Sequence, residues 1–224
     1  MRLLLTSGGV TNASIRARLV ELLGKPIAES RALFIPTAQW GQPLCSPGTV
    51  WRSIAGEGGG ERGMFDLGWA SVGVLELTAL PGISPDRWVP WVREADVLLV
   101  DGGEATYLAH WMRRSGLAEL LPSLQQTVWV GVSAGSMVMT PRIGPAFVDW
   151  PEGDGSDETL GVVDFSLFPH LDYPGWSSHT RENARRWADG IDGPAYAIDD
   201  QSAISVVNGA VEVVSEGHWE LLNP

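Results

Sequence analysis

A serine that directly follows a buried-type apolar run is the residue of this sequence best placed to do chemistry. The run Thr127–Val132 ends at Ser133, and Met137-Val138-Met139 then begins a helical apolar stripe. The string Gly131-Val132-Ser133-Ala134-Gly135 has the form of a nucleophile elbow, a strand-to-helix turn that presents a serine hydroxyl at the carboxyl edge of a sheet. Small neighbours keep so sharp a turn from clashing. The pattern predicts a nucleophile at Ser133.

A serine nucleophile needs a base that takes its proton, and histidine is the usual one. The chain has four histidines, at positions 110, 170, 179 and 218. His110 falls inside an amphipathic helical pattern and His218 lies in the C-terminal tail, whereas His170 follows the apolar run Leu167-Phe168-Pro169, which proline terminates. We therefore expect His170 at the end of a strand, on the same sheet edge as Ser133.

The third member of such a site would be a carboxylate that orients the imidazole and offsets its charge. Several acidic residues near the elbow and the histidine compete for this role, and the residues alone leave the choice open: Asp149, Glu152, Asp154, Asp157, Glu158, Asp164 and Asp172. The turn Gly102-Gly103 also follows an apolar run. It is either a tight turn into the next helix or the source of an oxyanion-hole N–H, paired with the N–H of Ala134.

Composition argues against several other classes of function. The 224-residue chain has a formal net charge of -12, which disfavours nucleic acid and anionic membranes as partners. Its one cysteine, Cys45, allows no intramolecular disulfide and suggests no thiolate metal site. No segment approaches the ~18 apolar residues of a membrane span, and the apolar N-terminal stretch is too short for a signal peptide. We expect a cytoplasmic protein.

The elements that must position these residues alternate along the chain. Apolar runs predict five strands, at Leu3–Thr6, Ala32–Pro36, Val72–Leu77, Val97–Val100 and Val128–Val132. Amphipathic segments predict helices at Ala13–Leu23, around Val50–Ile54, at Tyr107–Arg114 and at Leu117–Gln126. Such alternation implies a parallel sheet with helices on both faces and a ligand site at the carboxyl ends of the strands. The length fits one α/β domain over residues 1–224.

The C-terminal part of the chain, from Pro141 onward, predicts a long loop and then antiparallel strands. A Pro-, Gly- and Asp-rich loop from Pro141 to Gly161 is followed by an expected strand at Val162–Phe168 and a helix that starts near Thr180. Three more strands are expected at Ala195–Ile198, Ala203–Val207 and Val211–Val214. Asn208-Gly209 is a strong hairpin signal, so the sheet should finish antiparallel.

Five strings carry a resemblance to a known family: Leu99-Val100-Asp101-Gly102-Gly103-Glu104, Gly131–Gly135, Phe168-Pro169-His170, Thr180-Arg181-Glu182 and Ile198-Asp199-Asp200-Gln201-Ser202-Ala203. They resemble peptidase E, the α-aspartyl dipeptidase family of serine peptidases, within the class I glutamine amidotransferase-like group. The resemblance covers most of the chain. It implies an αβα sandwich of the flavodoxin-like type, with a mostly parallel, doubly wound sheet, antiparallel C-terminal strands, and serine in place of the cysteine nucleophile.

The resemblance also implies roles for individual residues. Ser133 would be the nucleophile and His170 the general base. Asp149, in Asp149-Trp150-Pro151, would be the third member, with Glu152 as the alternative among relatives; Asp172 stays an alternative because it follows His170 by two residues in the same turn.

The same resemblance places the oxyanion donors at Gly103 and Ala134 and gives Arg181 the aspartyl carboxylate of the substrate. Glu104 departs from the family pattern, because relatives with an aspartyl preference usually carry asparagine there. An extra negative charge could repel an acidic substrate or bind its free amine.

We therefore expect a serine peptidase that hydrolyses small peptides, including dipeptides with N-terminal Asp, without a metal or organic cofactor. The family likeness also suggests a homodimer. One alternative is an esterase of the α/β-hydrolase type, which shares the elbow string. Another is a catalytically silent small-molecule-binding protein on the same scaffold.

Overall fold

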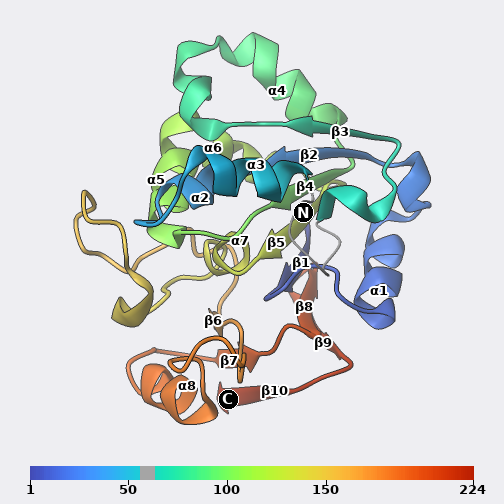
Figure 1. Ribbon diagram of the computed structural model, residues 1–224. Helices are drawn as coiled ribbons and strands as arrows, with labels where there is room; N and C mark the ends of the chain where they lie inside the picture. The colour runs from blue at the N-terminus through green and yellow to red at the C-terminus, as the bar shows by residue number, and fades with distance from the viewer. Residues whose placement is uncertain (56–63) are drawn as a thin grey trace.

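A seven-stranded sheet forms the centre of the computed structural model, which describes residues 1–55 and 64–224 (Figure 1). The strand order is β3-β2-β4-β5-β1-β8-β9; the first five strands are parallel, and β8 and β9 run antiparallel. The bounds are β1 Arg2–Thr6, β2 Arg31–Ile35, β3 Ser71–Val74, β4 Val97–Val100, β5 Val128–Val132, β8 Ser202–Val207 and β9 Ala210–Ser215. The predicted α/β fold, mostly parallel with antiparallel C-terminal strands, is confirmed.

Two apolar clusters cover the two faces of this sheet, because successive side chains of a strand point to opposite faces. One cluster contains Leu98, Val100 and Trp129 and packs against the helices α4 to α7. The other contains Leu99 and Val130 and packs against α1. The strands next to the elbow are therefore held by apolar packing on both sides.

The helices agree with the sequence in most places. Their bounds are α1 Ala13–Leu23, α2 Thr37–Trp40, α3 Pro47–Ala55, α4 Pro85–Glu94, α5 Ala105–Ser115, α6 Leu117–Leu120, α7 Ala134–Met137 and α8 Arg181–Ala188. The helix expected over Leu117–Gln126 instead ends at Leu120 and passes into a 3-10 turn, Leu121–Ser123, where Pro122 lacks an N–H for a helical hydrogen bond. Other 3-10 turns are Ile27–Glu29, Met64–Leu67, Leu77–Gly82 and Pro145–Phe147.

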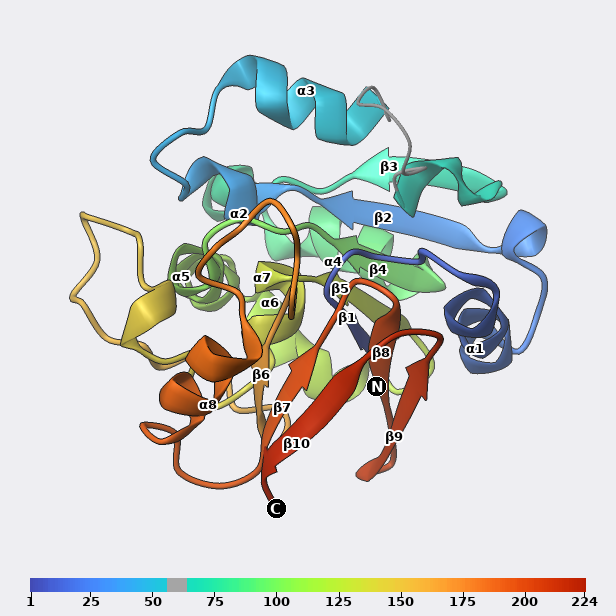
Figure 2. The same ribbon diagram turned by 60° about the horizontal axis from the view of Figure 1, so that its bottom comes forward.

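A second, three-stranded sheet corrects the expectation that Ser133 and His170 lie on the edge of one sheet. It has the order β10-β7-β6, with bounds β6 Ser166–Phe168, β7 Ala195–Ile198 and β10 Trp219–Asn223, and lies with α8 at the bottom of Figure 1. The strand expected at Val162–Phe168 is thus shorter, and it does not share a sheet with β5. It pairs instead with β7, in parallel, within the smaller sheet. The chain therefore reaches His170 from β6, which belongs to a different sheet from the strand β5 that ends at the elbow; Figure 2 labels both strands.

The hairpin and the last helix follow the sequence closely. Asn208 and Gly209 connect β8 to β9 with φ of 52° and 81°, the left-handed conformation that a tight hairpin turn needs. Helix α8 begins directly after Thr180, whose side chain accepts a hydrogen bond from the N–H of Asn183.

Glycines allow the short helix α7 to cross closely over the ends of β4 and β5. A Cβ on Gly135 would lie 2.3 Å from the carbonyl oxygen of Val100, and one on Gly131 would lie 2.3 Å from the carbonyl oxygen of Gly135. The indole Nε1 of Trp129 donates a 2.9 Å hydrogen bond to that same Gly135 oxygen. The elbow can form only because these positions have no side chain.

We predict that Gly135→Ala lowers the free energy of unfolding by about 1–3 kcal/mol, because overpacking forces the backbone apart. Gly82→Ala is the matched control: no atom lies within 4 Å of its added methyl, so a change within about 0.5 kcal/mol is expected. Urea denaturation followed by circular dichroism measures both. Equal midpoints for the two variants would contradict the close-packing argument.

Candidate active site

The backbone at Ser133 has the strained form of a nucleophile elbow. Its φ of 47° and ψ of -109° are unusual for a residue with a side chain and cost on the order of 1–3 kcal/mol. The carbonyl oxygen of Thr6 accepts hydrogen bonds from the Ser133 N–H (3.0 Å) and from Ser136 Oγ (2.7 Å). The end of β1 thereby holds both sides of the turn.

His170 has a carboxylate partner that the sequence analysis did not weigh. Its Nδ1 lies 2.7 Å from Oδ1 of Asp200, and the two side chains are only 12% and 18% exposed. An ionised carboxylate can only accept a hydrogen bond, so Nδ1 carries the proton and Nε2 is left as the basic nitrogen. This is the arrangement in which a carboxylate fixes the tautomer and the orientation of a catalytic imidazole.

The small sheet explains why these two residues meet. Strands β6 and β7 are parallel, and Phe168 is paired with Ala197. Continuing that register brings the residues just beyond each strand, His170 and Asp200, to the same sheet end. The signal available in the sequence was the acidic pair Asp199-Asp200 directly after the apolar strand Ala195–Ile198.

The carboxylates expected beside His170 make no hydrogen bond or ion pair with it; they are Asp149, Glu152 and Asp172. Asp172 pairs with Arg181, with 3.2 Å between Oδ2 and Nε. Glu152 lines a separate small pocket beside Trp150. Asp149 lines the same cavity as His170, yet its carboxylate makes no hydrogen bond or ion pair with another described residue.

The glycine turn after β4 lies directly against the nucleophile. A Cβ added to Gly102 would be 3.5 Å from Ser133 Cβ, and Gly103 has φ of 141° with its backbone pressed against Ala38. Within the described residues the N–H groups of Gly103 and Ala134 donate to no other group, although both residues line the cavity. Two unpaired N–H donors beside a serine can form an oxyanion hole.

The turn itself is fixed by the carboxylate of Asp101. Oδ1 accepts from the N–H of Gly102 at 2.8 Å, and Oδ2 accepts from Gln39 and Ser53. Burial raises the pKa of Asp101, while these hydrogen bonds oppose that shift.

Glu104, expected to touch substrate, is instead a structural cap. It is 1% exposed, and its carboxylate accepts from the N–H of Tyr107 and from Thr106 Oγ1 at the start of α5. A further 3.3 Å hydrogen bond comes from the N–H of Asp149. The carboxylate of Glu104 is therefore fully occupied by hydrogen bonds from the N-terminus of α5 and from the backbone of Asp149.

Ser133, His170, Gly103, Ala134 and Asp149 open onto one cavity of about 880 Å³. A volume of this size accommodates a small organic ligand. His179 also lines it, and burial lowers the pKa of His179 to about 4, with the nearby charge of His170 acting in the same direction. The His179 ring is therefore neutral near pH 7.

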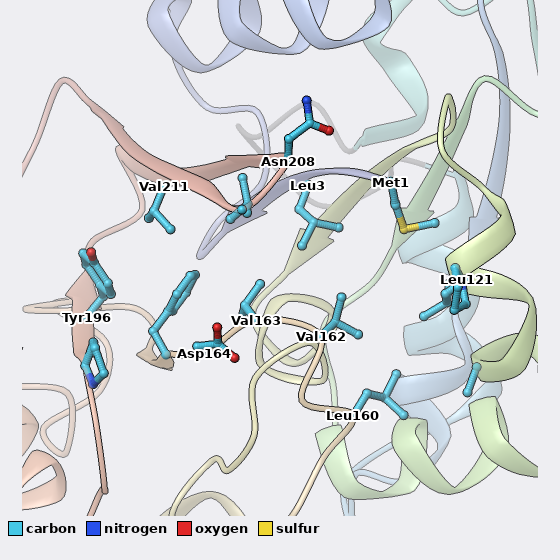
Figure 3. Close-up of a pocket in the computed structure, with 16 residues that line it drawn as sticks. Met1, Leu3, Leu121, Leu160, Val162, Val163, Asp164, Tyr196, Asn208 and Val211 are labelled. Carbon is cyan, nitrogen blue, oxygen red and sulfur yellow. The ribbon is translucent and has the colours of Figure 1, made fainter.

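Arg181 does not line this cavity, in contrast to the role that the resemblance gave it. A second hollow of about 690 Å³ lies between Leu3, Tyr196 and Val211; of the candidate site residues it contains Asp164 alone (Figure 3). Over residues 1–55 and 64–224, no group of three or more His, Cys, Asp or Glu side chains is arranged to hold a metal ion. The same residues include no helix long and apolar enough to span a membrane.

Solved structures share this fold. A candidate peptidase E from Listeria monocytogenes EGD-e superposes with a TM-score of 0.70 at 19% identity, covering 96% of this chain and 98% of its own. A peptidase from an acI-B1 Actinobacterium gives 0.68 at 20% identity, with 99% and 90% covered. No curated protein sequence is significantly similar to the chain.

The model of peptidase family S51 matches residues 3–214, which is nearly the whole sequence and includes every residue of the cavity described above. The resemblance seen in the sequence is thereby confirmed, and the chain belongs to peptidase family S51, whose members are serine peptidases.

Proposed function

We propose that this peptidase hydrolyses small peptides, dipeptides among them, with Ser133 as nucleophile, His170 as base and Asp200 as the residue that orients the base. The observation that carries the proposal is the part-buried 2.7 Å contact between His170 and Asp200, with His170 at the cavity that Ser133 also lines. A free serine hydroxyl is a poor nucleophile, and such a pair is what activates it.

In the proposed reaction Ser133 Oγ attacks the scissile carbonyl carbon while Nε2 of His170 takes its proton. The carbonyl oxygen becomes an oxyanion that the N–H groups of Gly103 and Ala134 stabilise. The imidazolium then gives the proton to the leaving amine, and the C–N bond breaks to leave an acyl-enzyme. Water, deprotonated by the same nitrogen, hydrolyses the ester and restores Ser133.

The free carboxylate of Asp149 supports a preference for peptides with an unblocked N-terminus. It lines the cavity without a cationic partner among the described residues, so an α-ammonium group could pair with it. This assigns to Asp149 the amine contact that the sequence suggested for the buried Glu104. The aspartyl preference implied by the resemblance depends on Arg181, which Asp172 engages outside the cavity wall.

Removing the nucleophile tests the reaction. Ser133→Ala should lower kcat on a dipeptide panel by more than about 10³-fold, because only oxyanion and binding effects remain. The same change should abolish labelling by a fluorophosphonate probe. The fold, and with it the backbone at Ala134, should be unaffected. Circular dichroism checks the fold. Undiminished turnover by the variant would sink the mechanism.

Replacing the proposed orienting residue tests the triad. Asp200→Asn should lower kcat by about 10³–10⁴-fold with little change in KM, because an amide no longer fixes the tautomer of His170. Asp172→Asn is the matched control, since an exposed ion pair contributes little. Its kcat should stay within about threefold of wild type. Loss of kcat in Asp172→Asn but not in Asp200→Asn would show that Asp172, and not Asp200, orients His170.

Asp149→Asn separates substrate binding from catalysis. We expect KM for peptides with a free amine to rise about tenfold, as for loss of a partly exposed charge-assisted hydrogen bond, while kcat changes little. N-acetylated peptides should show no difference between variant and wild type. A fall in kcat as large as that of Asp200→Asn would place Asp149 in the catalytic machinery instead.

A further inference from the structure

Aromatic rings form one continuous wall of the cavity that Ser133 and His170 share. Phe147 and Phe168 lie with ring centroids 5.2 Å apart, and Trp187 lies 5.5 Å from Phe168 and 6.3 Å from Phe147, all edge to face. Their mutual contacts hold them in place without a ligand. Pro145, Met137 and Leu44 add further apolar surface.

Positive charge is scarce in the same wall. Arg186 is the one arginine or lysine that lines the cavity within the described residues, and its guanidinium is already bound by Glu182 (2.9 Å) and Asn183 (2.8 Å). Its side chain is also 68% exposed. Arg181 is held by Asp172 outside the wall. The neutral ring of His179 supplies no cation either at neutral pH.

These walls favour one class of side chain. A carboxylate moved from water into this cavity loses hydration that no free cation of the described lining replaces, whereas an apolar side chain gains by leaving water. The carboxylate of Asp149 lines the same cavity without a partner among the described residues, and it would repel an acidic side chain.

The chain also indicates which substrate residue meets the aromatic wall. Phe147 and Asp149 lie two residues apart on one loop, and that loop is tied at its base by the Arg142–Asp157 ion pair of 2.8 Å. The α-amine and the side chain of an N-terminal residue branch from the same carbon atom. An amine paired with Asp149 therefore leaves that residue's own side chain in the cavity that Phe147 also lines.

We propose that the enzyme selects peptides whose N-terminal, acyl-side residue has a large apolar or aromatic side chain, and that it discriminates against aspartyl peptides. This inference rests on the proposed function, since it names the substrate class of the same site. Phe147, Phe168 and Trp187 are its specificity-determining residues.

The test compares kcat/KM for Phe-, Leu-, Asn- and Asp-para-nitroanilide with a free amine, using the wild-type protein and Ser133→Ala as the blank. The Phe and Leu substrates should exceed the Asp substrate by at least about tenfold, the range that a hydrophobic pocket can supply. The Asn substrate has the size of Asp without its charge, so it should also exceed Asp.

Two variants link the preference to the wall. Phe147→Ala should lower kcat/KM for the Phe substrate about tenfold, while Phe147→Leu, which keeps an apolar side chain, should retain most of it. Asp turnover equal to or above that of Phe would overturn the inferred specificity and leave the peptidase function standing. Turnover of none of the four substrates, together with no fluorophosphonate labelling of Ser133, would overturn the proposed function itself.

Discussion

Two consecutive buried residues at the end of β1 connect the halves of the site. The carbonyl oxygen of Thr6 holds the backbone of Ser133 and the hydroxyl of Ser136, whereas Ser7 Oγ accepts from the N–H of His170 at 3.0 Å and donates to the carbonyl of Ile198 at 3.0 Å. Thr6 and Ser7 are both fully buried. Because one strand end binds both the elbow and the histidine turn, the two sheets cannot shift against each other without losing these hydrogen bonds.

Local sequence patterns were sufficient to predict the elbow and the strands that hold it. The apolar runs of β4 and β5 are fully or almost fully buried, and their predicted bounds match the observed ones. The elbow follows from chemistry that is local as well, since Gly131 and Gly135 are neighbours of Ser133 in sequence and leave no room for a side chain. Such features depend on residues within one strand, one turn and one helix, which periodicity and residue size can reveal.

The partner of His170 could not be found in that way. Asp200 lies 30 residues beyond the histidine, and what brings them together is the parallel pairing of β6 with β7 in a separate sheet. The sequence pattern favoured a single sheet. The candidate carboxylates were therefore expected mainly in the loop after the elbow. The family resemblance pointed to Asp149 and singled out Glu104 as a departure from the family pattern, but Glu104 is buried and caps α5. Pairing between distant strands is not encoded in any single segment.

Carboxylates surround this site, yet three of them are committed to positioning. Asp101 holds the glycine turn, Glu104 caps α5 and Asp200 binds His170, so none of these charges is free to meet a ligand. Asp149 is left facing the cavity, in a protein with a net charge of -12. A free carboxylate in an acidic molecule attracts the ammonium end of a peptide and repels an acidic side chain beside it. In the proposed reaction the oxyanion would be stabilised by the neutral backbone N–H groups of Gly103 and Ala134, because the described lining of the cavity offers no unpaired cation for this task.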